Sequence, residues 1–372
     1  MRICILTQPL EKNYGGILQA YALQKVLADM GHDVTTLRFK PLYAQASSRI
    51  GFYWKIFRRF LSKLKGNKGI RYSNPDRQWE RYRQVNRVLE EFIENHIHCL
   101  DADIPLDGRR LPPFDAFIVG SDQVWRPVFS PRLTDFYLGF LRDDRPLRIA
   151  YAASFGVDGW ESSEEQTVVL RELARRFDRI SVREASGVAL CKDHLGVVAE
   201  LMPDPTLLLT REDYLDLCQD GAYDLPGQPY VATYFIDSDP WKEQLVSDFA
   251  ERHQLPVVPL GRFNWESGSD PMEKWLAGLA GAAYIVTDSF HGTVFSLIFR
   301  KDFISFVNRW RGSSRFHTLL EAFDLQDRLV DPGTISGFDI SQTDKEAFAL
   351  QLSMQREKGL AFLSEALAAN KR

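Results

Sequence analysis

The stretch that decides the fold is Ala283-Tyr284-Ile285-Val286-Thr287-Asp288-Ser289-Phe290-His291-Gly292-Thr293-Val294-Phe295-Ser296-Leu297-Ile298-Phe299. It begins with an apolar, β-rich run, continues with turn and capping residues at 288–292, and ends in an apolar pattern typical of a short buried helix. The stretch therefore predicts a strand, a tight polar turn and a helix. His291 then lies beside a helix N-terminus, where unpaired backbone N–H groups and the helix dipole favour an anion. This loop alone supports two interpretations: His291 holds or protonates an anionic substrate, or it only caps the turn.

Composition bounds the class of protein. The chain has 372 residues, which suggests two domains, and its 45% hydrophobic and 26% charged residues are typical of a soluble globular protein. The net charge of -4 argues against general affinity for nucleic acid. The four cysteines form no Cys-x-x-Cys pair, and His96 and His98 lack partner ligands, so we expect neither disulfides nor a metal site. A reducing cytoplasm fits best, and no signal peptide or membrane-spanning run is expected.

The chain begins with a strand, a glycine-rich turn and a helix. A strand at 2–7 precedes Gly15 and Gly16, and an amphipathic helix then leads to a second strand at 34–39. The two glycines let a ligand approach the backbone at the helix N-terminus, or they serve packing alone. Their spacing lacks the Gly-x-Gly-x-x-Gly fingerprint, so no dinucleotide is expected.

Two further strands end in polar residues. The strand at 114–119 is followed by Gly120-Ser121-Asp122-Gln123-Val124-Trp125, whose hydroxyl, carboxylate and amide suit sugar hydroxyls, with Trp125 as a stacking surface. The alternative is a capping Ser-Asp pair and a core tryptophan. The strand at 179–182 ends at Arg183, which is either a surface charge or a group that grips a carboxylate or phosphate.

The second half of the chain repeats the alternation of strands and helices from 230 to 307, after a proline-punctuated passage that begins at 202. We therefore expect an α/β protein with two doubly wound, Rossmann-like domains that face a cleft: residues 1–215 on the acceptor side, and 228–340 carrying His291. Residues 341–372 form a helical tail that can cross back to the first domain. Arginines after the last strand, Arg311 and Arg315 among them, make a second anion-binding point.

A basic, aromatic segment interrupts the first domain at about 41–75. Residues 34–75 contain no acidic residue and ten basic ones, with aromatic and aliphatic side chains between them. Residues 49–71 therefore resemble an amphipathic helix that lies on an anionic membrane surface. The alternatives are a helix that packs its aromatic face on the domain and, less favoured by the acidic remainder, a binder of single-stranded nucleic acid.

Five motifs occur in an order that resembles the bacterial polysaccharide pyruvyl transferase family. They are Asn13-Tyr14-Gly15-Gly16-Ile17-Leu18-Gln19-Ala20-Tyr21-Ala22-Leu23, Val119-Gly120-Ser121-Asp122-Gln123-Val124-Trp125, Ser181-Val182-Arg183-Glu184, Asp204-Pro205-Thr206 and Thr287-Asp288-Ser289-Phe290-His291-Gly292. The resemblance covers roughly residues 2–323. It implies a fold similar to GT-B glycosyltransferases, with the active site between the domains, and transfer of a pyruvyl group from phosphoenolpyruvate to a sugar as a cyclic ketal.

The resemblance also implies roles for residues. Arg183 and His291 match the family's arginine and histidine, whereas the family's usual lysine in the next loop is replaced here by Arg311 or Arg315, of which we prefer Arg315 because a helical pattern follows it. His291 is expected to act as the acid or to assist phosphate departure, and Asp122 or Asp288 to accept a hydroxyl proton. The expected donor-binding residues are Arg183, Arg315, Arg311, Ser289 and Gly292, and the expected acceptor-binding residues are Gly15, Gly16, Ser121, Gln123 and Trp125.

These expectations define a cytoplasmic enzyme, peripheral on the inner face of the cell membrane, with phosphoenolpyruvate as co-substrate, no other cofactor and no metal. Its acceptor is expected to be a polyprenyl-linked glycan of a surface polysaccharide. Two alternatives stand beside it: a GT-B-type glycosyltransferase that uses a nucleotide sugar, and a non-catalytic glycan-binding protein of the same fold.

Overall fold

The computed structural model describes residues 1–39, 83–102, 106–130, 132–143, 145–218, 221, 223–237, 239–264, 268–307, 312–342 and 344–368. The basic segment expected at about 41–75, including the membrane-docking stretch 49–71, lies outside these residues. Arg311, one of the two expected loop arginines, lies outside them as well.

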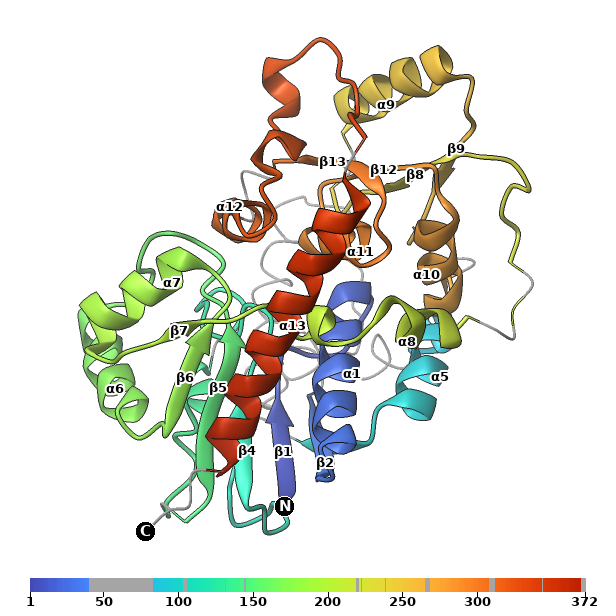
Figure 1. Ribbon diagram of the computed structural model, residues 1–372. Coiled ribbons are helices and arrows are strands. Elements are labelled where there is room, and N and C mark those ends of the chain that lie inside the picture. The colour runs from blue at the N-terminus through green and yellow to red at the C-terminus, as the bar shows by residue number, and fades with distance from the viewer. Residues whose placement is uncertain are drawn as a thin grey trace, which may run out of the picture.

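The first half of the chain folds around a parallel, seven-stranded sheet with the order β3-β2-β1-β4-β5-β6-β7 (Figure 1). Its strands are β1 Arg2–Leu6, β2 Asp33–Phe39, β3 Cys99–Ala102, β4 Ala116–Val119, β5 Leu147–Ala153, β6 Arg179–Val182 and β7 Glu200–Leu201. The central strands β1, β4, β5 and β6 are apolar runs that are largely buried, which is typical of a sheet covered by helices on each side.

Helices flank this sheet, and the sequence explains where they begin. In α6, Glu164–Ala174, the Ser163 side chain accepts from the backbone N–H of Gln166 in a capping box. In contrast, α1, Tyr14–Asp29, has no side-chain cap and is buried over nearly its whole length. The other helices of this half are α5 Arg87–His96, α7 Ala185–Leu190 and α8 Arg211–Asp216, with the 3₁₀ turn η3 at Pro205–Leu208.

The second half folds around a parallel five-stranded sheet with the order β14-β13-β12-β8-β9. The strands are β8 Val231–Tyr234, β9 Val257–Pro259, β12 Tyr284–Thr287, β13 Asp302–Phe306 and β14 Leu329–Val330. The helices are α9 Pro240–His253, α10 Met272–Gly281, α11 Phe290–Ile298 and α12 Ser314–Glu321, and a short antiparallel pair, β10 Phe263–Asn264 and β11 Gly268–Ser269, projects beside them.

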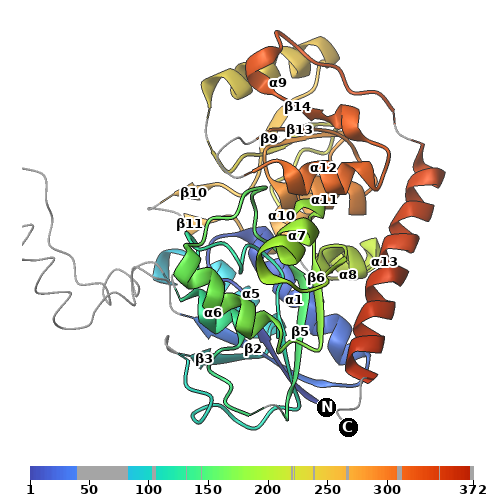
Figure 2. The same cartoon turned by 90° about the vertical axis from the view of Figure 1, so that its left-hand side faces the viewer.

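The last helix, α13 Lys345–Ala368, returns to the first half of the chain and runs along both parts of the molecule (Figure 2). Near its start, Phe348 packs on Phe323, with ring centroids 5.5 Å apart. Near its end, Phe362 packs on Tyr151 of β5 at 5.8 Å, and in between Arg356 Nη2 donates to the carbonyl of Leu209 at 2.9 Å.

The α/β class with two Rossmann-like units, predicted from the sequence, is confirmed. Parallel strands present their carboxyl ends at one edge of each sheet, and ligands of such folds bind at that edge. Both carboxyl edges face the region between the two sheets, where α1 meets α11 (Figure 1).

Candidate active site

The turn between β12 and α11 has the predicted strand–turn–helix geometry. Ser289 is the N-cap of α11, and its hydroxyl accepts from the Gly292 N–H at 3.3 Å. A Cβ on Gly292 would lie only 2.2 Å from Thr287 Oγ1, so glycine lets the first helical turn close on the strand. These contacts fix the backbone around His291, which is 5% exposed. Ser289 and Gly292 thus build the turn that positions the histidine.

His291 and Arg183, which come from different halves of the chain, meet at one carboxylate. Arg183 Nη1 donates to Asp204 Oδ2 at 2.7 Å, and His291 Nε2 lies 3.5 Å from the same oxygen. The distance to the histidine is that of an ion contact, since Nε2 has no hydrogen-bond partner among the described residues. Asp204 received no role from its sequence pattern, although it lies in the Asp204-Pro205-Thr206 motif. It is the residue that brings the two predicted groups together.

Asp204 is held as a fixed anion. Its Oδ1 accepts from the N–H and the hydroxyl of Thr206 at 3.1 and 2.8 Å, and its Oδ2 also accepts from Ser121 Oγ at 3.1 Å. Burial opposes ionisation of this carboxyl, but the charges of His291 and Arg183 outweigh it, so the pKa of Asp204 lies well below its usual value. A permanent carboxylate at this place therefore faces both the guanidinium of Arg183 and the imidazole of His291.

Asp122 completes the grip on Arg183. Its Oδ1 accepts from Arg183 Nη2 at 3.1 Å and from the Gln123 N–H at 2.8 Å. Burial again opposes ionisation, yet Arg183, followed by His291 and Arg315, lowers the pKa of Asp122. Arg183 is therefore held by two carboxylates, and only its Nε lacks a hydrogen-bond partner among the described residues. The guanidinium of Arg183 therefore holds Asp122 and Asp204 in position through its own hydrogen bonds.

A second cation, Arg315, shares an aromatic ring with Arg183. The Cζ of Arg183 lies 4.8 Å and that of Arg315 5.3 Å from the centroid of Phe290. Burial and the neighbouring Arg183 lower the pKa of Arg315 to about 10, while Glu184 and Asp122 counteract them. Both guanidinium groups remain charged at neutral pH. Two buried cations beside the N-terminus of α11 make a region that attracts an anion.

Glu184 supports this region from the first sheet. Its Oε1 accepts from Ser154 Oγ, the Phe155 N–H and the Gly156 N–H at 3.0, 2.6 and 3.1 Å. It is fully buried, and its Oε2 has no hydrogen-bond partner among the described residues. Glu184 follows Arg183 in the sequence motif, which is the signal that a pattern search could have used. It fixes the backbone that follows β5 next to the cluster.

The N-terminus of α1 presses against His291 from the first domain. A Cβ on Gly15 would lie 2.0 Å from Cγ and 2.1 Å from Nδ1 of His291, so only glycine fits. At Gly16 the corresponding neighbour is the side chain of Asn13, at 2.9 Å. Gly15 was expected to bind the acceptor through its backbone; in the structure its close neighbour is the imidazole. The glycine pair therefore lets two helix N-termini converge at the histidine.

Three residues predicted for the site have surroundings that do not suit the roles expected of them. Asp288 turns toward β8, where it accepts from the Ile236 N–H at 2.7 Å and from Lys242 Nζ at 2.8 Å, which does not fit a base for a sugar hydroxyl. Trp125 is 1% exposed and stacks on Tyr137, so its ring is closed to a sugar. Gln123 is 8% exposed and its Oε1 accepts from Arg126 at 3.2 Å. The motifs identified these three side chains, but the direction of each depends on neighbours that only the fold brings close.

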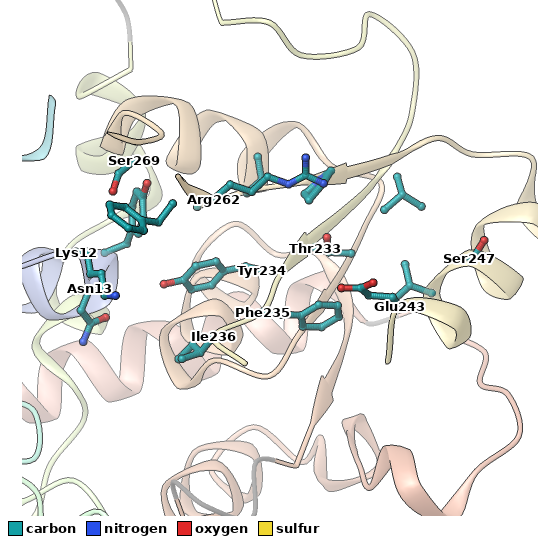
Figure 3. Close-up of a pocket in the computed structure, with 17 residues that line it drawn as sticks. Lys12, Asn13, Thr233, Tyr234, Phe235, Ile236, Glu243, Ser247, Arg262 and Ser269 are labelled. Atoms are coloured by element: carbon teal, nitrogen blue, oxygen red, sulfur yellow. The ribbon is translucent and has the colours of Figure 1, made fainter. Parts of the chain in front are cut away.

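A cavity of about 740 Å³ opens beside the cluster, at the carboxyl ends of β8 and β9 (Figure 3). None of the charged cluster lines it; Asn13 and Tyr14, which precede Gly15, separate the two. A smaller cavity of about 100 Å³ borders Arg183, Asp204 and Phe290 on the side of α13. Across the part of the chain that the structure describes, no group of three His, Cys, Asp or Glu side chains could hold a metal ion. No described helix is long and apolar enough to span a bilayer.

The two parallel sheets and the buried Arg183–Asp204–His291 cluster between them define an α/β protein with two Rossmann-like units and a charged centre where they meet. The chain belongs to the polysaccharide pyruvyl transferase family, whose model matches residues 13–309. That match includes Gly15, Asp122, Arg183, Asp204 and His291. No match was found among curated proteins.

Solved structures resemble the chain at low sequence identity. A UDP-GlcNAc 2-epimerase from Neisseria meningitidis bound to UDP-GlcNAc aligns with a TM-score of 0.49 at 9% identity, over 100% of both chains. UGT89C1 of Arabidopsis thaliana complexed with quercetin aligns at 0.44 and 10%, over 100% of this chain and 95% of that one. HepE of Anabaena in complex with UDP aligns at 0.43 and 11%, over 98% and 100%. At these TM-scores the similarity carries no functional argument.

Proposed function

We propose that this protein transfers the pyruvyl group of phosphoenolpyruvate to a sugar of a lipid-linked surface polysaccharide precursor and forms a cyclic ketal. The observation that carries the proposal is the contact of His291 and Arg183 with one buried carboxylate, Asp204, at the meeting point of two helix N-termini. Membership of the polysaccharide pyruvyl transferase family supports the reaction class.

The donor carries a phosphate and a carboxylate, and the cluster offers matching cations. Arg315 is buried and lies over the ring of Phe290, the first residue of α11, so we assign its charge to the donor together with the N-terminus of that helix. Arg183 lies over the ring of Phe290, and its ion pairs hold Asp122 and Asp204 in place. We therefore assign Arg315 to recognition and Arg183 chiefly to organisation.

His291 is the acid in this proposal. It delivers a proton to the methylene carbon of phosphoenolpyruvate, and a sugar hydroxyl attacks the cationic carbon that results. The carbon–oxygen bond to phosphate then breaks, and a second hydroxyl of the sugar closes the ring. Of the two hydroxyl protons, one restores the histidine and the other leaves with phosphate, so the reaction balances without a redox step. Asp122 is the carboxylate nearest to Arg183 after Asp204. We assign to it the first acceptance of a hydroxyl proton, before that proton returns to the histidine.

Mass analysis of the acceptor tests this function. Purified protein is incubated with phosphoenolpyruvate and candidate lipid-linked sugars, and we expect the acceptor to gain the mass of one pyruvate ketal. His291→Gln should abolish the gain, whereas His317→Gln, which changes an exposed histidine on α12, should leave it intact. Sugar transfer from a nucleotide donor without consumption of phosphoenolpyruvate would refute the proposal. Equal activity of the two histidine variants would remove His291 from the mechanism.

We also propose that the enzyme works at the membrane surface. The support is the sequence of residues 49–71, where basic and aromatic residues alternate in a chain of net charge -4. A liposome pull-down with anionic lipid tests it: the wild type should sediment with the vesicles, and replacement of Arg58, Arg59, Lys63 and Lys65 by Gln should release it. Equal recovery of both proteins would discard membrane docking and leave the transfer reaction untouched.

A further inference from the structure

The cavity of about 740 Å³ lies at the carboxyl ends of β8 and β9, beside the charged cluster. It is bounded below by β8 and β9, on one side by α9, and on the other by the loop that leads into α1 (Figure 3). Its volume of about 740 Å³ is within the range of small-molecule sites, roughly 300–1,000 Å³. The carboxyl edge of a parallel sheet is the usual position of such a site.

The side chains around the cavity suit a sugar. Phe235, Tyr234 and Phe263 offer aromatic faces, and Glu243 and Ser247 of α9 offer oxygen atoms. Figure 3 shows the Glu243 carboxylate directed inward near Phe235, and the Tyr234 hydroxyl directed toward Asn13. Aromatic faces combined with a few polar groups are a common means of fixing the orientation of a polar ring.

Two cations stand on opposite sides of the same space. Lys12 Nζ lies 5.2 Å from the ring centroid of Phe263, and Arg262 directly precedes Phe263 in the loop between β9 and β10. Both side chains are exposed, and neither forms an ion pair with a described residue. Cations placed beside an aromatic, polar cavity suit a ligand that carries phosphate on a sugar.

The cavity is adjacent to His291 through two short connections. β8, which ends at Tyr234, is the neighbour of β12, and Thr287 Oγ1 donates to the Tyr234 carbonyl at 2.6 Å. Tyr14 lines the cavity, and the next residue, Gly15, touches the imidazole. Neighbouring strands are about 4.8 Å apart. A ring bound at the end of β8 therefore lies one strand away from the β12–α11 turn that carries His291, beside Asn13 and Tyr14.

We propose that this cavity binds the acceptor as a hexose linked to a diphosphate, with the ring over Phe235 and the phosphates between Lys12 and Arg262. The inference rests on the proposed function and moves the acceptor from the first domain, where Ser121, Gln123 and Trp125 are buried, to the second. A diphosphate can come from a polyprenyl carrier or from a nucleotide sugar, and both sources share this chemistry.

Calorimetric titration tests the site without requiring turnover. The probes are a glucosyl diphosphate on a short prenyl chain and UDP-glucose. Ser247→Phe fills the cavity from α9, and Arg262→Gln removes a cation; each should raise the dissociation constant at least about tenfold. Gln244→Phe adds the same bulk to the exposed face of α9 and should bind like the wild type. Circular dichroism confirms that each variant is folded.

The outcomes separate the sources and the two proposals. Binding of the prenyl probe alone indicates a lipid-linked acceptor, and binding of UDP-glucose alone indicates a nucleotide-linked one; both support the cavity if Ser247→Phe abolishes them. Binding of neither probe, or binding that neither variant weakens, overturns the assignment. Phosphoenolpyruvate is titrated separately. If the wild type fails to bind it while a sugar diphosphate still binds in the cavity, the proposed function falls and the cavity assignment stands.

Discussion

Replacing Gly15 by Ala probes the contact on which the active site depends. The new Cβ would lie 2.0 Å from Cγ and 2.4 Å from Cβ of His291, whereas carbon atoms in contact are about 3.5–4.0 Å apart. Either the imidazole or the start of α1 must therefore move by roughly 1.5 Å. Because His291 is buried between Asp204 and Phe290, the ring has little free space to enter.

The magnitude follows from two opposed effects. Within an ordinary helix, glycine to alanine stabilises by about 1 kcal/mol, but overpacking of a filled site costs about 1–3 kcal/mol. We therefore expect the free energy of unfolding to fall by up to about 2 kcal/mol. Activity should suffer more, because a displacement of about 1 Å of a catalytic group can cost about 10²-fold in rate.

The assay combines thermal unfolding with the initial rate of ketal formation. Gly159→Ala is the matched control, since a Cβ at Gly159 meets no atom within 4 Å. We expect the control to keep its rate and the Gly15→Ala variant to lose it while remaining folded. A Gly15→Ala variant with a raised melting temperature and an unchanged rate would refute the packing of α1 on His291.

Three other predictions concern the cluster and its surroundings. Asp204→Asn leaves Arg183 and His291 without their shared anion, so the free energy of unfolding measured in urea should fall by about 3–5 kcal/mol; an unshifted midpoint would contradict this. Trp125→Phe loses the hydrogen bond from Nε1 to the Phe136 carbonyl, so it should lower the melting temperature while KM for the acceptor stays constant, and a raised KM would restore a sugar-stacking role. Burial raises the pKa of Glu11 from 4.5 to about 7, against a smaller effect of Lys12. Its contribution to stability is thus full below pH 4.5 and is lost as the pH rises through 7. Glu11→Gln should remove up to about 3 kcal/mol of this pH dependence, and parallel stability curves for variant and wild type from pH 4 to 8 would disprove it.

Most of the architecture followed from the sequence because buried parallel strands are continuous apolar runs. The strand at 284–287, its turn and its helix are where the pattern predicted them. Within the alternation predicted for 230–307, α9 spans Pro240–His253 and has proline in its first turn.

The elements that the sequence did not predict are short and lie at edges. β3, Cys99–Ala102, and β14, Leu329–Val330, are the outer strands of their sheets, and β10 and β11 are two residues each. Their pairing comes from the neighbouring strand, not from a hydrophobic period of their own, so no local pattern reports them.

In the site, the family resemblance predicted that Arg183 and His291 belong to one active site between the domains. Both residues follow strands of parallel sheets, whose carboxyl ends are the usual position of such sites. The partner between them could not be predicted, since Asp204 reaches Arg183 and His291 only after both sheets have formed. Asp288 illustrates the opposite case, because its position at the end of β12 was predicted. The hydrogen bonds from Lys242 and the Ile236 N–H that direct its carboxylate toward β8 could not be predicted from the sequence.

The path of α13 has a mechanical consequence. Its 24 residues span about 36 Å, and aromatic contacts anchor it to the two halves of the chain, to Phe323 just after α12 and to Tyr151 of β5. A continuous helix with contacts near both ends keeps the distance between the two contact points constant. Separation of the two halves along the helix axis would break one of these aromatic contacts, whereas rotation about that axis would keep both.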